Sequence, residues 1–91
     1  MIGDNVTKFI LFTDEECIPC GMVKKYLKSV KDDVVEEIVF YENLDIAEKY
    51  KVGFTPTLVV VDDEDNVLES FRGGMQITQN LRKVKSKYGL L

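Results

Sequence analysis

Two cysteines separated by two residues are the side chains best suited to chemistry in this sequence. They form the segment Cys17-Ile18-Pro19-Cys20, which follows an apolar run at residues 7–12 and opens a helical pattern. Thiol–disulfide exchange needs one thiolate that attacks and a second thiol that resolves the mixed disulfide. At a helix N-terminus, unpaired N–H groups and the macrodipole stabilise a thiolate. We therefore predict that Cys17 is the nucleophile and that Cys20, one turn later and less exposed, is the resolving thiol.

Pro19 fits this position because the first helical turn tolerates a residue without an N–H group. Its ring also removes a potential hydrogen-bond donor to the sulfur, so we expect Pro19 to tune the redox potential. Ile18 makes the dipeptide between the cysteines apolar. We expect Met22, which closely follows the motif, to pack beneath it.

The same cysteine spacing is also half of a metal site, and zinc normally needs four ligands. The chain has no His and no third Cys, so a closed site would need carboxylates or a second chain. We expect no metal and no cofactor other than the Cys17–Cys20 disulfide. A binding module that holds zinc or an iron–sulfur cluster between two chains stays open as an alternative.

Composition indicates one globular domain over residues 1–91, and we expect a monomer. The net charge of −4 argues against nucleic acid as the main partner and against a polybasic membrane anchor. Residues 1–5 contain an acid and no basic segment of the kind that opens a signal peptide. A close cysteine pair suits a reducing compartment, and we predict a cytoplasmic protein.

Periodicity predicts the element order β-α-β-α-β-β-α in an α/β fold. The expected strands are residues 7–12, 38–41, 57–61 and 67–71, the first three buried and the last an edge strand. The expected helices run from residue 17 or 18 to 30, from 45 to 50 with Asp45 as the cap, and from 77 to 88. Strands three and four form an antiparallel hairpin around a polar turn. A four-stranded mixed sheet with helices on both faces accommodates every element.

Thr55-Pro56 precedes the third strand, where a proline cannot donate to a central ladder. We predict a cis peptide bond before Pro56, which would bring this turn against the Cys17 sulfur. The exposed Thr55 backbone could then pair with an extended substrate peptide.

Three segments together resemble the thioredoxin family: Cys17-Ile18-Pro19-Cys20, Val52-Gly53-Phe54-Thr55-Pro56-Thr57-Leu58 and Phe71-Arg72-Gly73-Gly74. The resemblance implies a shortened thioredoxin fold without the usual extra N-terminal strand and helix. It implies a redox-active dithiol, with Cys17 as nucleophile, Cys20 as resolving thiol and Pro56 as the cis-proline. It further implies a substrate groove lined by Ile18, Phe54, Thr55, Pro56, Gly73 and Gly74.

Two positions depart from the thioredoxin pattern. Leu11 stands where thioredoxins bury an acid, and Glu16 stands where they place Trp before the first cysteine. We expect Glu16 to disfavour the Cys17 thiolate as a nearby like charge. Glu16 or water would then have to take over the proton relay.

The resemblance implies a protein-disulfide reductase that receives electrons from a flavoprotein thioredoxin reductase. The chain's length also resembles glutaredoxins, so glutathione is an alternative electron donor. Gly73-Gly74 fits that second family, but Met75-Gln76-Ile77-Thr78 lacks its acidic pair. Lys8, Lys51 or Arg72 could still contact a glutathione carboxylate.

Overall fold

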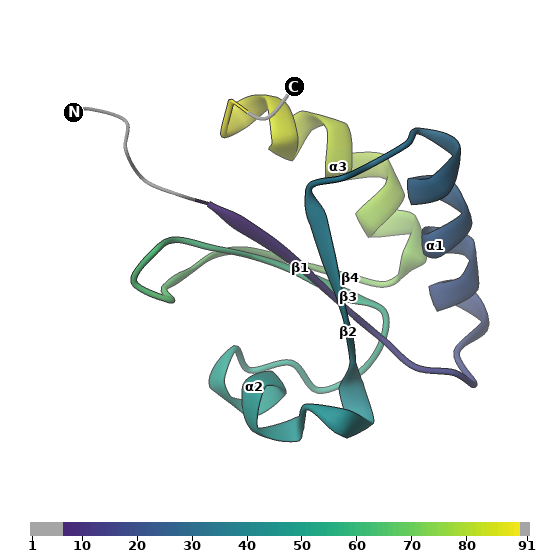
Figure 1. Ribbon diagram of the computed structural model, residues 1–91, viewed down its shortest axis with the longest axis vertical. Coiled ribbons are helices and arrows are strands. Elements are labelled where there is room, and N and C mark those ends of the chain that lie inside the picture. The colour runs from purple at the N-terminus through teal and green to yellow at the C-terminus, as the bar shows by residue number, and fades with distance from the viewer. Residues whose placement is uncertain (1–6, 90–91) are drawn as a thin grey trace.

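The computed structural model describes residues 7–89 (Figure 1). Its elements are β1 (Lys8–Thr13), α1 (Ile18–Ser29), β2 (Val35–Val39), the short 3-10 helix η1 (Phe40–Glu42), α2 (Leu44–Lys49), β3 (Thr57–Val61), β4 (Val67–Arg72) and α3 (Gly74–Lys87). This order confirms the predicted β-α-β-α-β-β-α arrangement. The predictions made on residues 1–5 lie outside the described residues.

The four strands form one mixed sheet in the order β2-β1-β3-β4. β1 runs parallel to β2 and antiparallel to β3, and β3 and β4 form the expected antiparallel pair. β1 and β3 occupy the centre, where Leu11 lies opposite Leu58. All five residues of β3 are buried, as are all residues of β1 after Lys8. Their continuous β-branched and apolar runs therefore match strands that are covered on both faces.

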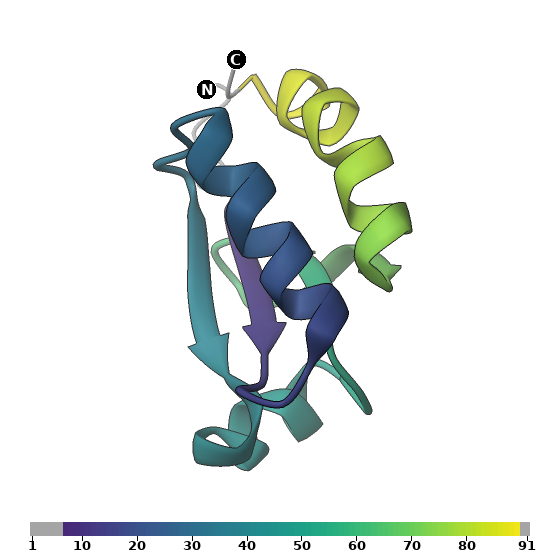
Figure 2. The ribbon, with the colours of Figure 1, turned by 90° about the vertical axis from the view of Figure 1, so that its right-hand side faces the viewer.

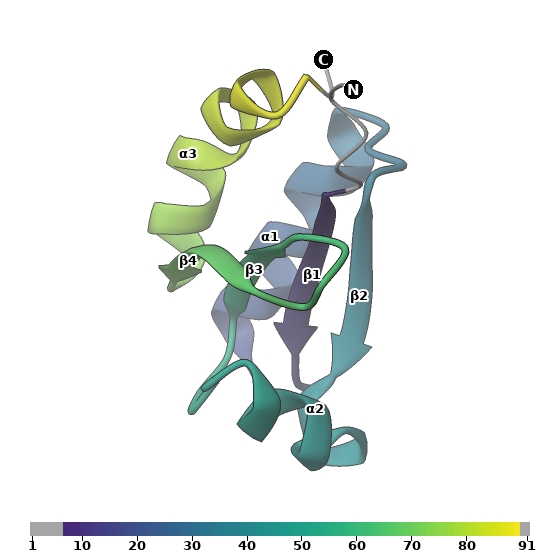
Figure 3. The same ribbon diagram turned by 90° about the vertical axis from the view of Figure 1, so that its left-hand side faces the viewer.

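Helices cover both faces of the sheet, and each face has its own apolar cluster. On one face, α1 and α3 lie side by side (Figure 2), and Val23, Ile77 and Leu81 pack against Phe9 and Leu58. The opposite face packs against α2, seen at the bottom of Figures 1 and 3. Because successive side chains of a strand point to opposite faces, β1 supplies alternate residues to the two clusters.

The second strand is where the sequence prediction was wrong. β2 ends at Val39, and Phe40 and Tyr41 belong to the 3-10 helix η1. Tyr41 is 68% exposed. β2 pairs only with β1, so it is an edge strand with one covered side, and its residues are half-buried or exposed. An apolar run by itself does not distinguish an edge strand from a central one.

Two helix starts also differ from the prediction. α2 begins at Leu44 with Asn43 in the cap position, and Asp45 lies in the first turn rather than at the cap. α3 begins at Gly74, three residues before the predicted start at Ile77. The apolar face of Ile77, Leu81 and Val84 is buried as predicted. The first turn of α3 consists of Gly74, Met75 and Gln76 and buries no apolar side chain, so the apolar periodicity did not reveal it.

Candidate active site

A disulfide joins Cys17 to Cys20, whose Cα atoms lie 5.2 Å apart. Cys17 is the N-cap of α1, with extended backbone angles, and its Sγ accepts a hydrogen bond of 3.1 Å from the Cys20 N–H. The sulfur thus takes the place that a Ser or Asp oxygen occupies at an ordinary N-cap. An N–H group directed at Sγ from the positive end of a helix stabilises negative charge on that sulfur.

The two sulfurs differ in their access to solvent. Cys20 is fully buried against the core, whereas Cys17 is half-buried. Pro19 lies in the first turn of α1, where the sequence placed it, and Ile18 is 83% exposed. An attacking sulfur must reach its substrate, so the arrangement offers one accessible sulfur with a shielded partner beneath it.

The Thr55-Pro56 peptide bond is cis, which confirms the prediction. Pro56 is buried, and its carbonyl oxygen accepts a hydrogen bond of 2.9 Å from the N–H of Gly73. In the same loop, the hydroxyl of Thr57 donates to the carbonyl of Phe54 at 2.7 Å. The bond from Gly73 connects the cis-proline loop to the start of α3, and the bond from Thr57 lies within the loop. Thr55 is half-buried, and Phe54 is 47% exposed.

The glycine pair connects the cis-proline loop to the cysteine motif. Gly73 has a φ of +89°, which L side chains rarely adopt. At Gly74, a Cβ atom would lie 3.4 Å from both the Cβ and the carbonyl oxygen of Pro19. Gly74 therefore lets the first turn of α3 approach the first turn of α1 closely. Pro56, the glycine pair and Pro19 form a continuous chain of contacts, although they are far apart in sequence.

The strand before the cysteines, β1, has no buried acid at position 11. Leu11 is fully buried in the apolar cluster beneath α1 and α3, and Glu16 is exposed in the turn that leads into α1. The polar side chain at the end of β1 is Thr13, which donates a hydrogen bond of 2.9 Å to the Glu37 carboxylate. Hydrocarbon thus replaces the carboxylate that the thioredoxin pattern places at this strand position.

Sequence reasoning missed two exposed methionines near the motif. Met22 does not pack beneath the cysteines but is 65% exposed, because Cys20 and Val23 take the buried side of α1. Met75 follows Gly74 directly and is 72% exposed. The spacing of Met22 from the exposed Ile18, four residues apart on one helix, was the signal for its position.

Within residues 7–89, no group of three or more His, Cys, Asp or Glu side chains is arranged to hold a metal ion. The redox-active group is the Cys17–Cys20 disulfide itself. None of the helices in this part of the chain combines the length and apolar content that a membrane crossing requires.

Comparison with protein-family models finds no match to this sequence, and comparison with curated proteins finds none either. Solved structures do match. A mutant thioredoxin from Halobacterium salinarum superposes with a TM-score of 0.77 and 27% identity, over 94% of this chain and 77% of that chain. Deadhead, a germline-specific thioredoxin of Drosophila melanogaster, gives a TM-score of 0.72 and 25% identity, over 91% and 83%. Mitochondrial thioredoxin 3 of Saccharomyces cerevisiae gives a TM-score of 0.68 and 24% identity, over 92% of this chain and 81% of that chain. This match supports the fold.

The fold and the disulfide at the start of α1 define a thiol–disulfide oxidoreductase of the thioredoxin fold. These structural relatives are thioredoxins, so the chain has the fold of thioredoxins and is similar to them over most of its length.

Proposed function

We propose that this protein reduces disulfide bonds in other proteins, with Cys17 as the attacking thiolate and Cys20 as the resolving thiol. The observation that carries the proposal is the contrast between the two sulfurs. Cys17 is accessible and accepts an N–H bond at the helix N-cap, and Cys20 is buried behind it. A stabilised, accessible thiolate attacks, and a shielded thiol within reach then completes the exchange.

In the reduced protein, the Cys17 thiolate attacks one sulfur of a substrate disulfide. An S–S bond forms between Cys17 and the substrate, and the second substrate sulfur leaves as a thiolate that takes up a proton. Cys20 then loses its proton and attacks Cys17 Sγ, which releases the first substrate sulfur. The substrate has gained two electrons and two protons, and the protein has been oxidised to the Cys17–Cys20 disulfide.

The surroundings of the cysteines supply tuning and substrate contacts in this proposal. Pro19 and Glu16 tune the redox potential. The substrate groove is formed by Ile18, Phe54, Thr55, Pro56, Gly73 and Gly74. Its support is the contact of Gly74 with Pro19 and the hydrogen bond from Gly73 to Pro56. The Thr55 backbone would pair with an extended substrate segment.

We further propose a cytoplasmic monomer whose single domain spans residues 1–91. A flavoprotein thioredoxin reductase is the proposed electron donor. Glutathione is the alternative donor, with Lys8, Lys51 or Arg72 as candidate contacts for its carboxylates. All three side chains are exposed.

The test is insulin reduction by the purified protein with dithiothreitol as reductant. We expect turnover in the wild type and none in Cys17→Ser, because the remaining thiol, Cys20, is buried and cannot form the first S–S bond. Cys20→Ser should accumulate a mixed disulfide between Cys17 and insulin, detectable by mass spectrometry. If alkylation at pH 7 labels Cys20 before Cys17, the two roles are reversed. Replacing dithiothreitol by a thioredoxin reductase with NADPH, or by glutathione, distinguishes the two donors.

A further inference from the structure

An exposed apolar row runs along α1 from the redox motif to the far end of the helix. Ile18, Met22, Tyr26 and Val30 recur at every fourth position, so they lie on one side of the helix. Ile18 is 83%, Met22 65% and Val30 49% exposed, and Tyr26 is partly exposed. Apolar side chains that are grouped on one exposed helix face favour an interaction site over a purely solvated face.

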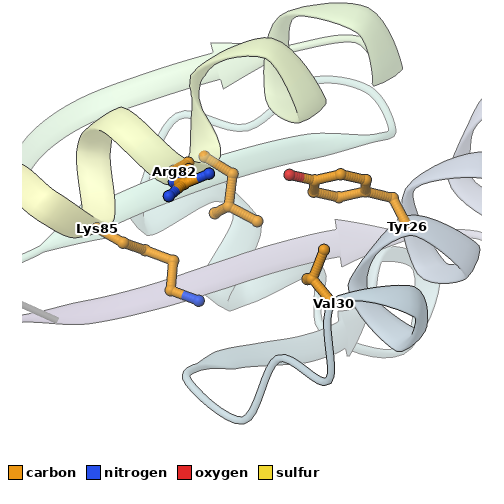
Figure 4. Close-up of a pocket in the computed structure, with 5 residues that line it drawn as sticks. Tyr26, Val30, Arg82 and Lys85 are labelled. Carbon is orange, nitrogen blue, oxygen red and sulfur yellow. The ribbon is translucent and has the colours of Figure 1, made fainter. Parts of the chain in front are cut away.

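The row ends at a hollow between α1 and α3. This cavity of about 260 Å³ is lined by Tyr26, Val30, Leu81, Arg82 and Lys85. In Figure 4 the Tyr26 ring extends from α1 toward α3, and Val30 points into the space between the two helices. The hollow therefore has apolar walls with cationic groups on the α3 side.

All the charged side chains of the two helices that form this surface are positive. They carry seven of the 12 Lys and Arg residues and none of the 16 Asp and Glu residues. Within the described part of the chain, ion pairs to other elements engage three of the seven: Lys24 with Glu37, Lys85 with Asp32 and Lys87 with Glu69. Arg82 is exposed beside the hollow and takes part in none of these pairs.

We propose that this row and hollow bind the segment next to the reactive cysteine of the substrate protein, and that the segment carries an acidic residue beside an apolar one. The inference rests on the proposed function, because Ile18 at the start of the row belongs to the redox motif. The apolar side chain fills the hollow over Val30 and Leu81, and the acid pairs with Arg82. An apolar row favours a polypeptide over the phosphate backbone of a nucleic acid.

Helix geometry sets the expected spacing in the substrate. Tyr26 and Val30 follow Ile18 by eight and 12 residues, or about 12 and 18 Å along the helix axis. An extended peptide spans about 3.3 Å per residue. The acid should therefore lie about four to six residues from the reacting cysteine.

The experiment is a single turnover of the pre-reduced full-length protein with disulfide-linked peptides. One peptide carries Leu and two Glu residues four to six positions from its cysteine, and the matched peptide carries Gln in place of Glu. We expect the second-order rate constant to be about threefold higher for the Glu peptide, as for a partly exposed ion pair. Raising the salt concentration to about 0.5 M should reduce the preference, because salt screens such pairs.

Arg82→Gln should abolish the preference. Lys83→Gln is the matched control, because it removes the same charge from an exposed position of α3 that does not line the hollow. It should keep the preference. Reaction of each variant with the small uncharged dipyridyl disulfide reports the intrinsic reactivity of Cys17, which should not change.

Equal rates for the two peptides would overturn the inference but leave the proposed function intact. A preference that survives Arg82→Gln, or that Lys83→Gln removes equally, would overturn it as well. If neither peptide nor insulin oxidises the Cys17–Cys20 pair, the proposed function itself fails.

Discussion

The two ends of helix α1 face the same neighbour, α3, but they are built in opposite ways. At the N-terminal end, Cys17 is half-buried beside the exposed Ile18. Just beyond the C-terminal end, the Asp32 side chain is 1% exposed and forms an ion pair with Lys85 of α3. Asp32 also accepts hydrogen bonds of 2.9 and 2.8 Å from the N–H groups of Val34 and Val35.

Within this one pair of helices, the N-terminal end of α1 serves reactivity, and the ion pair beyond its C-terminal end serves stability. Burial by itself raises the pKa of Asp32, but the hydrogen bonds from Lys85 and from the backbone outweigh it, and the pKa lies below its ordinary value. The carboxylate thus has all its partners inside the protein. Cys17 has one N–H partner and an open side, as an attacking group requires.

The largest effect on stability should come from removing one partner of the buried pair. We expect Lys85→Ala to lower the free energy of unfolding by about 3 kcal/mol, because it leaves a buried carboxylate without its counterion. Urea unfolding of the reduced protein measures this. Reaction of the folded variant with the small dipyridyl disulfide, which does not occupy the hollow, should stay near the wild-type rate.

Lys83→Ala is the matched control, since this lysine of the same helix is exposed. We expect it to change the free energy of unfolding by less than about 0.5 kcal/mol. Equal losses for the two variants would show that the Asp32 end of the helix pair is not distinctive.

An intermediate effect should come from crowding the redox end. Gly74→Val places a branched side chain against Pro19, and we expect a loss of about 2 kcal/mol in unfolding free energy together with slower insulin reduction. At Gly21 a Cβ would meet nothing within 4 Å. Gly21→Ala, in the interior of α1, should instead stabilise the protein by about 0.5–1 kcal/mol. A neutral Gly74→Val would mean that close approach of the two helices is not required.

The smallest effect concerns acid stability. Because the pKa of Asp32 is lowered by folding, its contribution is complete above the ordinary value of 3.8 and is lost as the pH falls through the folded-state pKa. The gap in unfolding free energy between the wild type and Asp32→Asn should therefore shrink on acidification below about pH 4. Urea titrations from pH 7 to pH 2.5 measure the gap, and a constant gap would contradict the assignment.

Local spacing predicted much of the redox end. The cysteine motif after a buried strand, the helix that starts at Ile18 and the cis bond before Pro56 were all expected from neighbouring residues. Met22 was misplaced because helical periodicity gives several candidate faces, and only the packed neighbours select one. The fully buried second strand was wrong for a related reason: apolar composition does not report how many strands lie alongside.

The sequence by itself determined which groups can exchange disulfides, because Cys17 and Cys20 are three positions apart and share one helical turn. The tertiary structure decided what surrounds them. Gly74 meets Pro19, and Lys85 meets Asp32 across a separation of 53 residues, only because α3 packs beside α1 on one face of the sheet. Such contacts depend on how whole helices and strands pack against one another, and this packing cannot be predicted from the spacing of neighbouring residues.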